Sequence, residues 1–112
     1  MTHKLVITDR VFEQLDSGYV WYQQNVPQVA AAWFNGWIDA LNDLCQEPER
    51  YPLAHESPLF PFPIHQLLYG VGKKKSHRAL FVIRPHAVVV LTIRHLSQQD
   101  FTPEEMLDES PP

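Results

Sequence analysis

The chain contains one cysteine and no long hydrophobic run. Cys45 alone excludes a disulfide framework and a zinc-binding cysteine pattern, and we expect it to be a small buried side chain on a helix. No segment reaches the roughly 18 consecutive apolar residues of a transmembrane helix, and the first ten residues lack the apolar segment of a signal peptide. We therefore expect a cytoplasmic protein without a membrane partner. A chain of 112 residues suits one domain, 1–112, with one core.

Motifs that hold metals or cofactors are also missing. Four histidines are scattered along the second half of the chain, with no carboxylate nearby that would complete a metal site: His65, His77, His86 and His95. Gly70-Val71-Gly72 is a turn rather than a glycine-rich phosphate loop. We expect no metal and no cofactor.

Acidic residues are absent from 57–99. That stretch contains six basic residues, Lys73, Lys74, Lys75, Arg78, Arg84 and Arg94, and so carries +6; the other 3 bases and 13 acids give −10, for a net charge of −4. Such an asymmetry favours an anionic partner, and it makes these six residues candidates for anion or partner binding. The alternative is that acidic helices balance the stretch within the same fold.

The strongest structural signal is a β-hairpin. Segments 78–84 (RALFVIR) and 88–95 (VVVLTIRH) are rich in residues that favour strands, and Pro85 suits the turn between them. Segment 64–69 (IHQLLY) predicts a third strand beside this hairpin. Two-residue alternation places one mainly apolar set on the core face, namely Ala79, Phe81, Ile83, Val89, Leu91, Ile93 and His95. The other face ends in arginines but is also largely apolar, so we expect it to be partly covered.

A strand and two helices precede the hairpin. Residues 4–7 predict a short strand, and Thr8 or Asp9 can cap the helix that follows. Apolar residues then recur at helical spacing in a first helix (Val11, Phe12, Leu15, Tyr19, Tyr22 and Val26) and in a second helix from about Pro27 to Gln46. Trp33 and Trp37 should pack in the core.

Three further expectations concern a helix glycine, the proline-rich loop and the C-terminal tail. Gly36 is a candidate for close approach between the two helices. Residues 47–63 contain five prolines and predict an irregular loop over the sheet edge. After His95 the chain becomes acidic, with Asp100, Glu104, Glu105, Asp108 and Glu109, and a helix start at Pro103 predicts one turn at most within this tail, about 96–112.

A strand, two helices and a three-stranded meander, in this order, resemble the RelE/ParE superfamily of toxins from bacterial type II toxin–antitoxin and plasmid stabilisation systems. The resemblance extends from about Leu5 to His95. It rests on the helix end Leu44…Pro48…Tyr51, on QLLYG at 66–70, and on RALF at 78–81 paired with VLTIRH at 90–95. It implies an α+β fold in which an antiparallel sheet packs on a helical hairpin.

The resemblance also implies a function. Such toxins are neutralised by a cognate antitoxin, and oligomers can form through that complex. ParE-like members inhibit DNA gyrase by protein contact, whereas RelE-like members cleave messenger RNA on the ribosome. We expect a ParE-like toxin; the alternatives are a ribosome-dependent endoribonuclease and a family member that has lost toxicity.

Several residues match functional positions of the nucleases. Arg78 matches the arginine that opens the family's middle strand, where the nucleases use it to hold the scissile phosphate. Lys73, Lys74 and Lys75 lie where those nucleases have basic residues before that strand. His95 lies near a catalytic histidine of some relatives, and His77 or His95 could transfer protons because imidazole titrates near neutral pH. If the chain is a nuclease, Arg78, His77 and His95 are its candidate catalytic residues. Otherwise His77 is an exposed loop-end residue and His95 packs at the end of a strand.

Other parts of a nuclease site are missing. The last strand of RelE-like nucleases is followed by an arginine and a tyrosine, where this chain has LSQQ at 96–99. Arg94 and His95 are neighbours on a strand and should point to opposite faces. We therefore expect no efficient RelE-type ribonuclease, and the sequence leaves open whether the chain is an enzyme.

Overall fold

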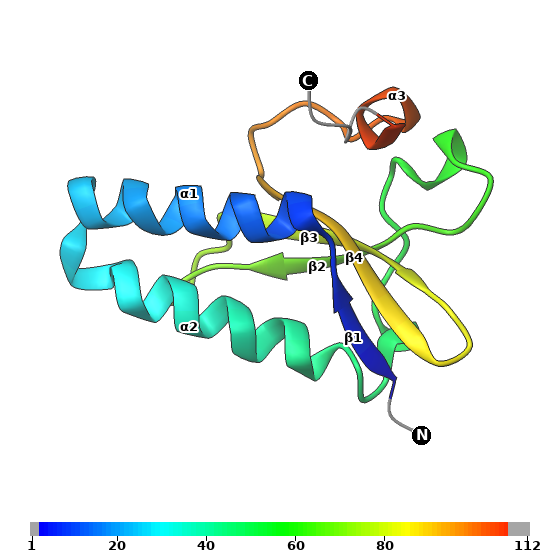
Figure 1. The fold of residues 1–112 in the computed structure, drawn as a ribbon, viewed down its shortest axis with the longest axis horizontal. Coiled ribbons are helices and arrows are strands. Elements are labelled where there is room, and N and C mark those ends of the chain that lie inside the picture. The colour runs from blue at the N-terminus through cyan, green and yellow to red at the C-terminus, as the bar shows by residue number, and fades with distance from the viewer. Residues whose placement is uncertain (1–2, 108–112) are drawn as a thin grey trace.

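The computed structural model describes residues 3–107 as an α+β fold (Figure 1). A helical hairpin lies against one face of a four-stranded sheet with the order β1-β4-β3-β2. The elements are β1 (Lys4–Ile7), α1 (Asp9–Asn25), α2 (Pro27–Asp43), β2 (His65–Tyr69), β3 (His77–Ile83), β4 (Ala87–His95) and α3 (Pro103–Leu107), with two 3₁₀ turns at Pro48–Arg50 and Ser57–Leu59. The predicted fold class and the predicted meander are confirmed.

The first strand has its predicted bounds, whereas the cap of the first helix and the end of the second differ from the prediction. β1 pairs in parallel with residues 87–90 of β4 at the edge of the sheet. Thr8 occupies the N-cap position of α1, but its hydroxyl donates to the carbonyl of Val90 at 3.0 Å instead of capping the helix. α2 ends at Asp43, and residues 44–46 form the turn that follows it.

The sheet contains a β-bulge that changes which side chains face the helices. Phe81 pairs with Val90, whereas Leu80 pairs with Thr92, so Leu91 is an extra residue in β4. The alternation of β4 reverses there: Val90 and Ile93 face the helices, and Leu91 packs on the opposite side of the sheet. The predictions for Val89 and Leu91 were therefore wrong, and Val88 and Val90 face the helices in their place, because strict alternation ignores the inserted residue.

The core between sheet and helices is built around two tryptophans. Trp33 and Trp37 are 1% and 0% exposed, as predicted, and pack with Phe81. Phe12 was predicted to share this core but is 54% exposed.

Two glycines allow neighbouring elements to approach each other closely. A Cβ on Gly18 would collide with the Trp33 ring, so the helices approach each other there. Gly36 instead faces the hydroxyl of Tyr69 on β2, so its predicted role between the helices was wrong.

The second face of the sheet is covered, as predicted, by loop residues. Leu53 forms a bridge with His65 at the edge of β2, and the chain then crosses the face itself rather than staying at the edge. A second cluster gathers there: Ala54, Phe60, Ile64, Leu80, Val82 and Phe101. Phe60 and Phe101 stack with ring centroids 5.6 Å apart.

The segment after β4 folds back over this second cluster. Phe101 is fully buried, and α3 is a single short helix of five residues, in line with the predicted turn. Asp108 and Glu109 of the predicted acidic tail lie outside the described residues. No helix among residues 3–107 is long and apolar enough to cross a membrane.

The two phenylalanines of opposite exposure test this core. Phe81→Ala should lower the free energy of unfolding by about 3–5 kcal/mol, because it empties a fully buried site. Phe12→Ala removes the same atoms from a half-exposed side chain and should change that free energy by about 1 kcal/mol or less. Denaturant unfolding of both variants checks this, and equal effects would contradict the assigned core.

Candidate functional site

The two candidate catalytic histidines meet at one end of the sheet. His77 and His95 are directly paired across β3 and β4, with ring centroids 5.1 Å apart. They line a cleft of about 220 Å³ together with Gln14 and Ser17 of α1 and Gln98. Sequence reasoning named both histidines but could not place them in contact.

His77 is packed against the tryptophan core rather than exposed at the end of a loop. Its ring centroid lies 5.6 Å from that of Trp33 and 6.3 Å from that of Trp37, and Nδ1 lies 2.8 Å from the Ser76 hydroxyl. Burial, with a smaller contribution from His95, lowers the pKa of His77 to about 4. At neutral pH the ring is therefore uncharged, and it is too weak a base for efficient proton abstraction.

His95 is exposed and held by the residues that follow β4. The amide of Ser97 donates to Nδ1 at 3.1 Å, and the amide of His95 donates to Oε1 of Gln98 at 2.7 Å. Because Nδ1 accepts this bond, the proton of the neutral ring is on Nε2. The segment that replaces the nuclease Arg and Tyr thus forms a local cap around His95.

Gln14 is a site residue that sequence reasoning missed. β1 pairs with β4 only as far as Val90, which leaves the edge of β4 open beyond that residue. Gln14 closes it: Oε1 accepts from the amide of Ile93 at 2.8 Å, and Nε2 donates to the Thr92 hydroxyl at 2.9 Å. Gln14 is 78 and 79 residues away from Thr92 and Ile93 in the sequence, so no local sequence pattern predicts these contacts.

Arg78 is buried and already paired. It is 5% exposed, and both terminal nitrogens donate to the carboxylate of Glu56, which is 0% exposed. Glu56 also accepts from the amide of Phe101 at 3.0 Å. Burial alone would raise the pKa of Glu56, but the hydrogen bonds from Arg78 and Phe101 outweigh it and lower the pKa to about 2.

Arg94 is also buried, but a single hydrogen bond pairs it with a partly exposed carboxylate. It is 7% exposed, stacks on the Phe101 ring at 5.4 Å and donates from Nη2 to Glu105 at 2.6 Å. Arg94 and His95 lie on opposite faces of the strand, as predicted. Glu56 and Glu105, which sequence reasoning did not connect with the arginines, lie just outside the acid-free stretch.

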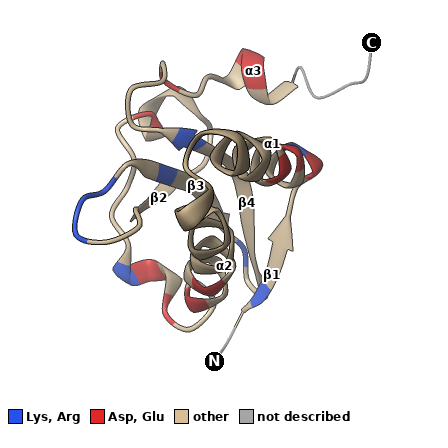
Figure 2. Ribbon diagram, turned by 90° about the vertical axis from the view of Figure 1, so that its left-hand side faces the viewer, with Lys and Arg blue, Asp and Glu red and all other residues tan. Residues whose placement is uncertain are grey.

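The six candidate cations therefore separate into two kinds. Arg78 and Arg94 are internal, and their charge is neutralised within the chain. Lys73, Lys74 and Lys75 are exposed on the loop between β2 and β3, the long blue segment in Figure 2. Arg84 is exposed beside the β3–β4 turn, over the Phe62 ring at 5.5 Å. Only the lysines and Arg84 can meet a partner without rearrangement of the fold.

One group of side chains has the composition of a metal site. Single ligand atoms of His55, Glu56 and Asp100 lie within 4.8 Å of one another. However, the His55 ring lies between the two carboxylates, with Nε2 2.6 Å from Asp100 and Nδ1 3.6 Å from Glu56, and Glu56 is held by Arg78. Because the ring occupies the space between the two carboxylates and Arg78 already pairs with Glu56, the arrangement does not fit a bound cation.

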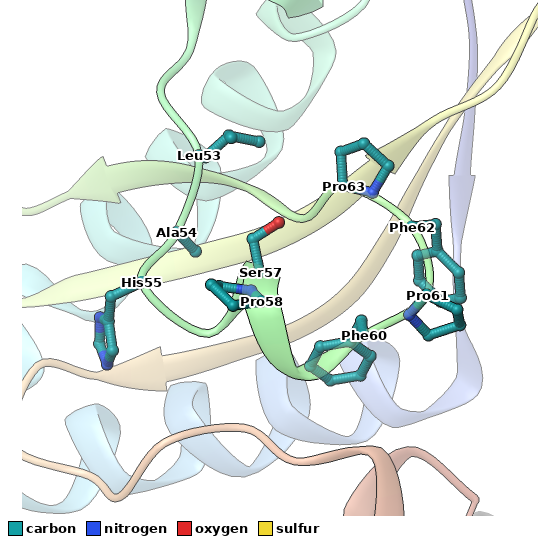
Figure 3. Close-up of a pocket in the computed structure, with 9 residues that line it drawn as sticks. All are labelled: Leu53, Ala54, His55, Ser57, Pro58, Phe60, Pro61, Phe62 and Pro63. Carbon is teal, nitrogen blue, oxygen red and sulfur yellow. The ribbon is translucent and has the colours of Figure 1, made fainter.

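The proline-rich loop encloses an apolar groove of about 530 Å³ on the second face (Figure 3). Its lining includes Leu53, Phe60 and Phe62, and His55 is the one titratable side chain among the lining residues that Figure 3 labels. The groove can hold apolar groups but has no constellation for catalysis.

The low pKa of His77 predicts a pH-dependent stability. Between about pH 6.5 and pH 4 the unfolded chain binds a proton on His77 that the folded chain does not, so stability should fall as pH falls through this window. The slope for one proton is at most about 1.4 kcal/mol per pH unit. Urea unfolding of His77→Gln should show a shallower decline than wild type. His86→Gln, at an exposed turn, is the control; identical pH profiles for wild type and His77→Gln would contradict the burial of His77.

Solved structures with the same fold come from toxin–antitoxin systems. The chain matches a chain of the chromosomal ParDE TA system from P. aeruginosa with a TM-score of 0.69 at 17% identity, covering 86% of this chain and 98% of that one. It matches an E. coli toxin RelE mutant in the free state with a TM-score of 0.54 at 11% identity, covering 83% and 82%.

A third similarity is to the toxin–antitoxin complex RelBE2 from Mycobacterium tuberculosis, with a TM-score of 0.50 at 22% identity and coverage of 85% and 99%. No family model matches the chain, and no curated protein does. The predicted resemblance is confirmed for the fold: the chain has the fold of the RelE and ParE proteins.

Proposed function

We propose that this protein is the toxin of a type II toxin–antitoxin module, acting in the cytoplasm and neutralised by a cognate antitoxin. Support comes from the fold, which this chain shares with toxin–antitoxin proteins over most of its length. The order of the strands and helices and the sequence segments that resemble the family agree with this proposal.

We further propose a ParE-like mode of action, in which the toxin inhibits its target, for example DNA gyrase, by protein contact. The observation that carries this is the buried pair of Arg78 and Glu56. A phosphate can take the place of Glu56 only if the pair is opened, and a separated buried charge is destabilising by about 3–5 kcal/mol. His77, with its pKa lowered to about 4, is also a poor general base at neutral pH.

The second candidate function is a RelE-like ribonuclease that acts on ribosome-bound messenger RNA. The contact between His77 and His95 in a cleft, with ring centroids 5.1 Å apart, favours it. Its acid–base chemistry would have to rely on exposed His95, since the internal pairing of Arg78 and Arg94 leaves no free guanidinium among the candidate catalytic residues. A family member without toxicity would combine this fold with neither activity.

The mode of action can be tested in a bacterial host that expresses the protein with and without the product of any neighbouring antitoxin-like gene. We expect growth arrest that the neighbour relieves, inhibition of supercoiling by purified gyrase, and no messenger cleavage. Messenger cleavage that His95→Ala abolishes, in a variant that is still folded, would instead establish the ribonuclease. Growth unaffected by expression would contradict toxicity altogether.

The exposed lysines make a separate prediction about the antitoxin. Lys73, Lys74 and Lys75 are exposed and contiguous, and an acidic antitoxin segment that contacts them should bind less tightly as salt rises, because exposed charges are screened beyond about 8–10 Å at physiological ionic strength. Lys73→Gln/Lys75→Gln should weaken binding and flatten the salt dependence, measured by calorimetry. Salt-independent binding would indicate an apolar contact instead.

A further inference from the structure

From its second turn onward the helical hairpin carries acidic residues and no basic ones, and the same holds for the turn after it. Residues 11–49 contain no Lys, Arg or His and six acids, which are Glu13, Asp16, Asp39, Asp43, Glu47 and Glu49. All six are exposed, and none takes part in an ion pair within residues 3–107. Figure 2 shows this acidic character as red segments on α1 and α2, away from the blue lysine loop. Unlike the arginines of the sheet, these charges are not neutralised by the fold.

A groove between the two helices lies within this acidic face. It has a volume of about 380 Å³ and is lined by Tyr19 and Phe34, whose rings meet edge to face at 5.4 Å, and by Asp16, Ala31 and Asn35. The floor is thus aromatic and the rim carries a carboxylate. A space of this size suits one or two large apolar side chains.

Aromatic and acidic side chains also lie next to the groove on both helices. Because α1 and α2 are antiparallel, Phe12 and Glu13, one turn before Asp16, lie toward the same end of the hairpin as Asp39, one turn after Asn35. Phe12 is 54% exposed, so an apolar surface continues past the groove with acids on both helices. An exposed Phe12 next to the partly buried rings of the groove is typical of an interaction surface.

We propose that this face binds a protein segment that carries an apolar anchor flanked by lysines or arginines. The anchor enters the groove between Tyr19 and Phe34, and the basic residues pair with Asp16, Glu13 and Asp39. Complementary charge selects the partner and its register, and a cation beside the partly exposed rings gains a further cation–π contact. The same acids repel nucleic acid and acidic proteins. The inference does not depend on the toxin proposal.

The test uses the full chain and two short amphipathic peptides, one of leucine and lysine and one of leucine and glutamate. Calorimetry should show binding of the lysine peptide, with amide shifts in NMR spectra that centre on Tyr19 and Phe34, and the glutamate peptide should leave these two amides unshifted. Asp16→Asn/Asp39→Asn should weaken binding roughly 3- to 20-fold, as expected for two exposed charge pairs.

A matched control removes two charges elsewhere on the acidic stretch. Glu47→Gln/Glu49→Gln changes the net charge by the same amount away from the groove and should leave binding within about twofold. Equal weakening by both double variants, or amide shifts on the sheet instead of the hairpin, would overturn the proposal. Self-association of the chain alone that Lys74→Glu abolishes would show that the acidic face binds a second copy of the chain. This result would overturn the proposal as well.

Discussion

A buried ion pair between Arg78 and Glu56 holds the second layer of this protein together. Arg78 comes from the middle strand, Glu56 from the proline-rich loop, and the same carboxylate receives the amide of Phe101 from the segment after the last strand. Three segments distant in sequence therefore meet at one group. Removing either charge would leave the other buried and unpaired, which is strongly unfavourable, so the stacking of Phe60 on Phe101 and the cover over the second face depend on this pair.

The pair also decides which charges face a partner. The acid-free stretch made six basic residues candidates for binding an anionic partner, but two of them, Arg78 and Arg94, pair with Glu56 and Glu105 within the fold. What is exposed is a short lysine loop on one side and, on the helical hairpin, a set of unpaired acids. The two proposed surfaces therefore have opposite signs and can bind different partners, one acidic and one basic.

The sequence predicted the fold well because its signals were local. Alternating strand residues, helical spacing and prolines define β1 to β4 and both long helices within a few residues. The errors lie where distant segments determine the outcome. The β-bulge at Leu91, the contact of Gly36 with Tyr69 and the closure of β4 by Gln14 have no local pattern. The candidate site was predicted only as a set of residue types, since burial and pairing of Arg78 require knowledge of where Glu56 folds.

The most direct test of this account is a double-mutant cycle on Glu56 and Arg78, using Glu56→Leu, Arg78→Met and the double variant. If the pair organises the second layer, each single variant should be strongly destabilised and the double variant should recover part of the loss, with a coupling free energy of about 2–3 kcal/mol in denaturant unfolding. A coupling near zero, with additive effects, would show that the two charges act independently and would contradict the account.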